Sequence, residues 1–261
     1  MDILKSRVLA ALRRRFPDTL LSPDKLAVLH KGRFANAIVF RYRDQDLDLV
    51  IKDYSHCPWI VKQSIGRFFI GREYKNLSRL RETASVVSDS YRLTPLMLAY
   101  PYVEGVALKS LRTENVLLPT EFFRQMEAHV AEMHALNIVH LDLRNLGNVL
   151  CTEDGDCHFI DFQSAISLRW VPTRLHGVLK AADRSAVYKS WDLLGEEPLP
   201  EAKRRWLEAF NRIRKRWVFR GYPLSRWVAR LRSKATPEAA YRDRRDADWA
   251  ARNSGEGSSV L

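Results

Sequence analysis

The residues best suited to chemistry lie between positions 139 and 163. Two aspartates, Asp142 and Asp161, stand in polar loops beside short apolar segments, and Asn148 lies between them. Carboxylate and amide oxygens are ligands that Mg²⁺ accepts, and this set leaves one carboxylate to orient a hydroxyl group. Phosphoryl transfer requires these groups, so the segment predicts a phosphotransferase site.

The order of these residues resembles the motifs of the protein-kinase-like superfamily. His140, Asp142 and Asn148 follow the pattern H-x-D-L-x-x-x-N with one extra residue before the asparagine, and Asp161-Phe-Gln163 resembles D-F-G. The resemblance implies that Asp142 orients the attacking hydroxyl, while Asn148 and Asp161 hold Mg²⁺ between the nucleotide phosphates. Asn145 could replace Asn148, but Asn148 directly precedes a predicted strand and is preferred.

A lysine and a glutamate upstream extend the resemblance. Leu49-Val-Ile-Lys52 is similar to the strand motif V-A-I-K, and Glu73 lies twenty-one positions later on a predicted helix. The resemblance implies that Lys52, fixed by Glu73, contacts the α and β phosphates of ATP. Matching elements in the family's order cover about residues 25–190, so ATP and Mg²⁺ are the expected cofactors.

Four further site residues follow from the same resemblance. Gly32 opens a segment with the spacing of a glycine-rich nucleotide loop, of which only this first glycine is kept. Tyr102 and Glu104 lie in a segment similar to the hinge that holds adenine. Arg144, two residues after Asp142, occupies the position where a basic side chain contacts the γ-phosphate.

Each of these residues taken alone has an ordinary structural explanation. Lys52 would be a strand-edge lysine, Glu73 an exposed helix residue and Gly32 a turn glycine. The ordered agreement of several motifs favours the kinase-like interpretation.

The segment after Asp161 is short, and no Ala-Pro-Glu motif follows it. This resembles the compact kinases: lipopolysaccharide-core and Kdo sugar kinases, RIO kinases and aminoglycoside-type kinases. We expect a phosphotransferase of the lipopolysaccharide-core or Kdo type, acting on a hydroxyl of a glycan or glycolipid. The alternatives are a RIO-like serine/threonine protein kinase and a nucleotide-binding pseudokinase that acts as an adaptor.

The hydrophobic pattern predicts the elements that position these residues. Three strands are expected between residues 25 and 52, a helix from 59 to about 82, and strands again between 91 and 102. A long amphipathic helix over 119–136, a strand pair around 148–160 and further helices to about 234 follow.

These elements predict an α+β fold with two lobes. The expected division is a β-rich N-lobe over 1–104 that starts with a helix, a helical C-lobe over 105–235 with a shortened activation segment, and a flexible tail over 236–261.

The positive charge is concentrated near the C-terminus. The chain carries 43 Lys and Arg against 31 Asp and Glu, and residues 203–245 hold fifteen of the bases but three of the acids. This amphipathic segment could be a solvated face of packed helices, a site for an anionic membrane surface or a nucleic-acid site, the last being the less favoured partner.

The three cysteines show no metal-ligand spacing, and no run of residues is apolar enough for a signal or spanning segment. We therefore expect a cytoplasmic protein, or one peripheral on the inner face of the membrane.

Overall fold

The computed structural model describes residues 2–32, 36–87 and 89–216. Residues 1–207 form one compact unit, and the packing below concerns this unit. The predicted division at residue 104 lies within it.

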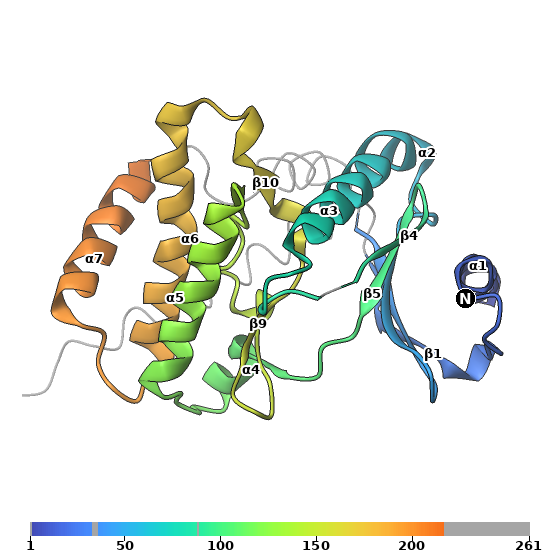
Figure 1. The fold of residues 1–261 in the computed structure, drawn as a ribbon, viewed down its shortest axis with the longest axis horizontal. Coiled ribbons are helices and arrows are strands. Elements are labelled where there is room, and N and C mark those ends of the chain that lie inside the picture. Colours follow the sequence, from blue (N-terminus) through green and yellow to red (C-terminus); the bar gives the residue numbers. More distant parts are fainter. Residues whose placement is uncertain (1, 33–35, 88, 217–261) are drawn as a thin grey trace, which may run out of the picture. The chain divides into compact units, whose positions relative to one another are not determined.

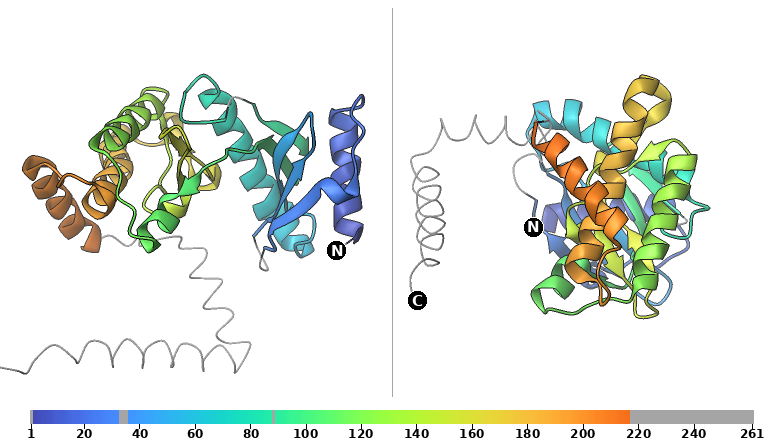
Figure 2. Two further views of the ribbon diagram at one scale, coloured as in Figure 1. Left: turned by 90° about the horizontal axis from the view of Figure 1, so that it is seen from below. Right: turned by 90° about the vertical axis from the view of Figure 1, so that its left-hand side faces the viewer.

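The N-terminal part is built on a five-stranded antiparallel sheet with the order β1-β2-β3-β5-β4 (Figure 1). Helix α1 packs on one face of this sheet, and α3 lies on the other (Figure 2). The elements are α1 (Asp2–Arg15), a 3₁₀ turn (Pro23–Lys25), β1 (Leu26–His30), β2 (Ile38–Arg43), β3 (Asp48–Asp53), α2 (Trp59–Val61), a π-helical turn (Lys62–Gly66), α3 (Arg67–Leu80), β4 (Tyr91–Thr94) and β5 (Met97–Pro101).

Alternation along β3 sorts its side chains between the two faces of the sheet. Leu49 and Ile51 join the cluster under α1, whereas Val50 joins the cluster on the α3 side. Because strand side chains alternate between faces, Lys52 shares the face of Val50. The alternation along β3 therefore places Lys52 on the face of the sheet that α3 covers.

The C-terminal part is mostly helical. Helices α5 and α6 pack together, with the rings of Phe123 and Trp191 stacked at a centroid distance of 5.4 Å. Short strands form a three-stranded sheet β6-β8-β9 and a pair β7-β10. The elements are β6 (Val106–Ala107), α4 (Leu108–Thr113), α5 (Thr120–Ala135), β7 (Ile138–Val139), β8 (Val149–Cys151), β9 (Cys157–Phe159), β10 (Ile166–Ser167), α6 (Thr173–Leu194) and α7 (Glu201–Arg216), with 3₁₀ turns at Leu146–Asn148, Phe162–Ser164 and Leu168–Trp170.

The structure confirms the predicted α+β fold, with a β-sheet N-terminal region and a helical C-terminal part. The three strands between 25 and 52 and the helix over 119–136 are present within one or two residues. The helix expected from 59 to about 82 is interrupted by the π-helical turn, and α4 was not predicted. The helical segment beyond 216 and the tail over 236–261 lie outside the described residues.

Within the described ranges, no helix combines the length and the apolar character needed to span a bilayer.

Candidate active site

Lys52 joins the N-terminal sheet to the segment after β9. Its Nζ donates to Oε1 of Glu73 at 2.6 Å and to Oδ1 of Asp161 at 2.8 Å. Lys52 and Glu73 are 7 % and 1 % exposed, so the cation and one of its two carboxylates are largely shielded from bulk water. The structure thus brings together three of the predicted site residues that are 21 and 109 positions apart in the chain.

The charges in this cluster stabilise one another. Burial alone would lower the pKa of Lys52, but the carboxylates of Asp161 and Glu73 outweigh it and raise that pKa well above its usual range. Burial raises the pKa of Glu73, although Lys52 opposes the shift. The pKa of Asp161 is lowered because the attraction of Lys52 exceeds the effect of burial. Lys52 therefore stays protonated, as a phosphate contact requires.

Asp142 and Asn148 form a second cluster in the loop after β7. The Asn148 amide donates to Oδ2 of Asp142 at 2.9 Å and to its backbone carbonyl at 3.1 Å. Asn145 is exposed, and its amide donates to Oδ1 of Asn148 at 3.2 Å. Burial raises the pKa of Asp142. A carboxylate with a raised pKa accepts a proton more readily, which suits a group that must orient a hydroxyl.

His140 connects this loop to the segment that carries Asp161. One ring nitrogen, Nε2, lies 3.0 Å from the carbonyl of Ile160, and Nδ1 lies 3.4 Å from the backbone nitrogen of Asp142. A neutral ring with its proton on Nε2 satisfies both contacts, and burial lowers the pKa of His140 in agreement. The backbone N–H of Ile160 also donates to the carbonyl of Asn148 at 3.0 Å. The two loops are therefore held side by side.

Asp183 on α6 fixes the backbone of the Asp142 loop. Its carboxylate accepts from the backbone N–H groups of His140 and Leu141, both at 2.8 Å, and lies 3.1 Å from Nε2 of His134. Leu141 has a φ of 67°, a left-handed conformation that costs a non-glycine residue about 1 to 2 kcal/mol. The bonds from Asp183 hold the chain in this conformation.

Sequence reasoning missed Asp183, although a signal was present. Asp183 lies on the same helical stripe as Ala186, Val187 and Leu194, all of which are buried. A buried acid on an apolar helix face must accept hydrogen bonds from buried donors, and backbone N–H groups are possible donors.

Asp161 also has a left-handed backbone, with a φ of 64°. The next residue, Phe162, is buried and packs on the ring of His140 at a centroid distance of 4.6 Å. Strain of this kind persists where the surroundings determine the conformation and is concentrated at functional sites. Here the packing of Phe162 and the ion pair with Lys52 hold Asp161 in its left-handed conformation.

Arg144 has a different environment from the one that the sequence suggested. Its guanidinium donates to Oγ of Ser185 at 2.8 Å and to the Ser185 carbonyl at 3.3 Å, so the side chain turns toward α6. Lys189 donates to the backbone carbonyl of Arg144 at 2.9 Å. The sequence spacing predicts that Arg144 lies in the same loop as Asp142, but its hydrogen bonds with Ser185 on α6 set the direction of its side chain. The expected contact between Arg144 and the γ-phosphate stays a prediction.

Tyr102 and Glu104 lie in the connection between β5 and β6, where the hinge was expected. The Arg41 guanidinium lies 3.4 Å from the centroid of the Tyr102 ring and 3.1 Å from Oε2 of Glu104. Arg41 also forms a two-point ion pair with Asp48, at 2.8 and 2.6 Å, and the backbone N–H of Tyr102 donates to the carbonyl of Asp48. β2 and β3 thus fix the start of this connection.

Gly32 follows β1 and has a φ of 57°. A Cβ atom at this position would lie 2.7 Å from the carbonyl oxygens of Asn36 and Ala37. The turn therefore requires glycine. Residues 33–35, the centre of the expected nucleotide loop, lie outside the described residues.

The donor set around Asn148 and Asp161 fits a magnesium ion bound with nucleotide phosphates. Both side chains offer oxygen, the Asp161 side chain is 39 % exposed, and the backbone bond from Ile160 holds the two segments together. In the described part of the chain, no group of three or more His, Cys, Asp or Glu side chains could hold a metal by itself. A site of this kind depends on the phosphates for its remaining ligands.

Comparison with models of known protein families identifies the family of this chain. The profile of the RIO domain matches residues 30–173, which is more than half of the chain and includes Lys52, Glu73, Asp142 and Asp161. The chain belongs to the RIO-domain family. This RIO domain is therefore part of the protein-kinase-like superfamily, as the motifs predicted. No curated protein matches the chain.

Members of the RIO-domain family are kinases, that is, ATP-dependent phosphotransferases. The match confirms the kinase-like fold of this chain. It does not extend to the narrower expectation of a lipopolysaccharide-core or Kdo sugar kinase, which rests on the sequence motifs alone.

Proposed function

We propose that this RIO domain transfers the γ-phosphate of ATP to a hydroxyl group. In this proposal Lys52, held by Glu73, contacts the nucleotide phosphates, and Asp142 orients the attacking hydroxyl. Asn148 and Asp161 would hold Mg²⁺, which neutralises charge on the phosphates when bound.

The main observation in support of the proposal is that Lys52 contacts both Glu73 and Asp161. Its Nζ lies within 2.8 Å of a carboxylate from α3 and of one from the segment after β9. A buried lysine paired with a buried glutamate and a half-buried aspartate contributes little net stability compared with apolar packing. An arrangement that joins the sheet, α3 and the Asp161 segment at one ammonium group is understandable if that group binds phosphate.

Two classes of acceptor follow from two different observations. The RIO-domain match favours a serine or threonine hydroxyl of a protein. The short chain between Asp161 and the start of α6 at Thr173 leaves little surface for an extended peptide, and this favours a compact acceptor such as a glycan hydroxyl.

Transfer of label from ATP tests both the activity and the acceptor class. The full chain is incubated with ATP labelled in the γ-phosphate, Mg²⁺ and fractionated cell extract, and the label is then traced to protein or to glycolipid. We expect Asp142→Asn to lower the transfer at least about a hundredfold, because it removes the carboxylate that orients the hydroxyl. Glu153→Gln, an exposed change between β8 and β9, is the control and should transfer at the wild-type rate.

The outcomes separate the candidates. Label in protein supports the serine/threonine kinase, and label in glycolipid supports the glycan kinase. Binding of ATP without transfer to any fraction contradicts the enzymatic proposal and supports the adaptor.

A further inference from the structure

Two segments of the compact unit lack acidic residues. Residues 54–72 include α2, the π-helical turn and the start of α3, and residues 162–182 run from the turn after Asp161 into α6. Neither segment contains Asp or Glu, whereas their exposed cations include Arg67 in the first and Arg169 and Arg174 in the second. A surface built from these segments is therefore positively charged.

Large apolar side chains are exposed in the same two segments. In the first segment Trp59 is 70 %, Ile60 73 % and Phe68 59 % exposed. In the second, Trp170 is 89 % and Leu175 41 % exposed. A single exposed apolar side chain needs no explanation, but a cluster of this kind indicates an interaction site.

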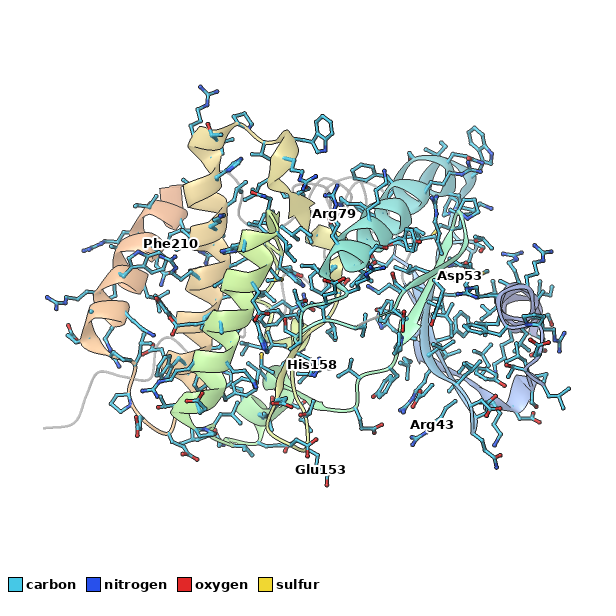
Figure 3. The ribbon with its side chains drawn as sticks, in the orientation of Figure 1. Arg43, Asp53, Arg79, Glu153, His158 and Phe210 are labelled. Carbon is cyan, nitrogen blue, oxygen red and sulfur yellow. The ribbon has the colours of Figure 1, made fainter. Side chains whose placement is uncertain are left out.

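One hydrogen bond joins the two segments directly: the Arg72 guanidinium donates to the carbonyl of Gln163. Further along α3, beyond the first segment, the Asn76 amide donates to the Ala165 carbonyl at 2.8 Å, and Arg79 donates to Oγ of Ser167 at 3.0 Å. Arg79 leaves α3 beside β10 in Figure 3. In Figures 1 and 2 (right), α2, α3 and the gold start of α6 all lie along the upper side. We call the surface formed by residues 54–72 and 162–182 the apolar-basic face.

We propose that the apolar-basic face binds the surface of an anionic lipid bilayer. Tryptophan is favoured at the boundary between headgroups and acyl chains, because its ring is apolar and its N–H can reach water or a headgroup. Ile60, Phe68 and Leu175 would enter the same layer, while Arg67, Arg169 and Arg174 would meet anionic headgroups.

The composition of the face favours lipid over nucleic acid. Aliphatic side chains such as Ile60 and Leu175 gain free energy from burial among acyl chains, but they offer no stacking surface to a base. The absence of carboxylates from both segments means that none must be desolvated against an anionic headgroup. An anionic bilayer surface suits both the exposed aliphatic side chains and the absence of carboxylates.

The face also continues from the active site. Trp170 lies nine residues after Asp161, and β10 pairs with β7, which directly precedes His140. If the proposed function holds, a bilayer seated on this face would hold its lipids near the loop of Asp142, which favours an acceptor presented at a membrane. The lipid interaction itself needs neither ATP nor phosphate transfer.

Flotation of the full chain with vesicles tests the proposal. One set of vesicles contains phosphatidylcholine with phosphatidylglycerol, and the other contains phosphatidylcholine alone. The test variant combines Trp59→Ser, Ile60→Ser and Trp170→Ser. The matched control combines three equally apolar changes on other surfaces, Ile3→Ser, Leu20→Ser and Leu117→Ser, at residues that are 78 %, 98 % and 50 % exposed.

We expect the wild type and the control to float with the anionic vesicles and to bind the neutral ones more weakly. The test variant should lose at least about tenfold in partitioning, or about 1.4 kcal/mol. Charge reversal by Arg169→Glu with Arg174→Glu should weaken binding to the anionic vesicles but not to the neutral ones. All of these side chains are exposed, so thermal unfolding of the variants should match that of the wild type.

Several results would overturn the proposal. These are a wild type that does not float, a test variant that floats as the wild type does, and binding that is lost only when the bases of residues 203–245 are replaced. The face would be assigned to nucleic acid instead if the wild type did not bind anionic vesicles but bound single-stranded RNA tightly and in a salt-sensitive way. Failure of phosphate transfer would leave flotation unchanged, so the two proposals fail separately.

Discussion

Among single residues, the site depends on one ammonium group between two carboxylates. Lys52 compensates Glu73, which is 1 % exposed, and Asp161, whose side chain is 39 % exposed. Removing one partner of a buried ion pair leaves an uncompensated charge, and this destabilises proteins far more than the intact pair stabilises them. The role of Lys52 in stability can therefore be measured apart from its proposed contact with the nucleotide phosphates.

We expect Lys52→Met to lower the free energy of unfolding by about 3 kcal/mol at neutral pH. Without Lys52, burial raises the pKa of Glu73 further, so the folded variant holds a proton that the unfolded chain releases. Stability of the variant therefore falls as pH rises. Denaturant unfolding at pH 5 and pH 8 should show the larger loss at pH 8.

Lys75→Met is the control, because Lys75 is an exposed residue of the same helix as Glu73. It should unfold within about 0.5 kcal/mol of the wild type. An equal loss for Lys52→Met at the two pH values would contradict the coupling with Glu73.

Lys52 and Glu73 were predicted through their resemblance to kinase motifs. The structure adds a physical reason for Lys52, because the alternation along β3 places it on the face of the sheet that α3 covers. Arg144 and Asp183 show where this reasoning stops. The direction of the Arg144 side chain depends on Ser185, and the role of Asp183 depends on the backbone of His140, and both contacts span more than forty residues of the chain.

At the scale of elements, backbone geometry decides how two glycines respond to the same substitution. Gly32→Ala places a Cβ 2.7 Å from two carbonyl oxygens at a φ of 57°, and we expect a loss of about 1 to 3 kcal/mol. In Gly71→Ala, by contrast, the new Cβ meets nothing within 4 Å in the middle of α3, so helix propensity should stabilise the protein by about 0.5 to 1 kcal/mol. Thermal unfolding of both variants checks the signs, and a stabilised Gly32→Ala would contradict the turn geometry.

Helix α6 is the element that holds the backbone of the Asp142 loop. In Asp183→Asn an amide group must replace one of the two oxygens that accept backbone N–H groups at 2.8 Å. We expect kcat for transfer to fall about a hundredfold, with KM for ATP nearly unchanged, since Lys52 and Asp161 are untouched. The loss of one buried hydrogen bond should lower stability by about 1 to 3 kcal/mol.

Asp192→Asn on the same helix is the matched control, because Asp192 is exposed and pairs with Arg204 at 3.3 Å. It should change neither kcat nor stability measurably. Equal effects of the two variants on kcat would show that α6 acts through general stability and not through the loop.

Helix α4 and the π-helical turn illustrate the limits of pattern reasoning for elements. Each is six residues or fewer, and a segment this short gives no clear hydrophobic period. The long elements were predictable because their buried residues repeat over several turns, as in α5.

In the molecule as a whole, the Lys52 cluster and the excess of basic residues belong to different parts of the sequence. The excess of basic residues falls on 203–245 in the sequence, whereas the three groups of the Lys52 cluster sum to one negative charge. Within the compact unit, α3 links to the segment after Asp161 through Asn76 and Arg79. The site is thus defined by contacts between distant segments and not by the net charge of the chain.

In the proposed mechanism, nucleotide binding and phosphate transfer rely on different carboxylates. Calorimetric titration with ATP, with and without Mg²⁺, is combined with transfer assays on Asp142→Asn and Asp161→Asn. We predict that Asp142→Asn binds Mg·ATP within about threefold of the wild type but transfers at least about a hundredfold more slowly. Asp161→Asn should lose the gain in affinity that Mg²⁺ gives the wild type. Loss of Mg·ATP binding in Asp142→Asn, or full transfer by this variant, would contradict the separate roles of Asp142 and Asp161.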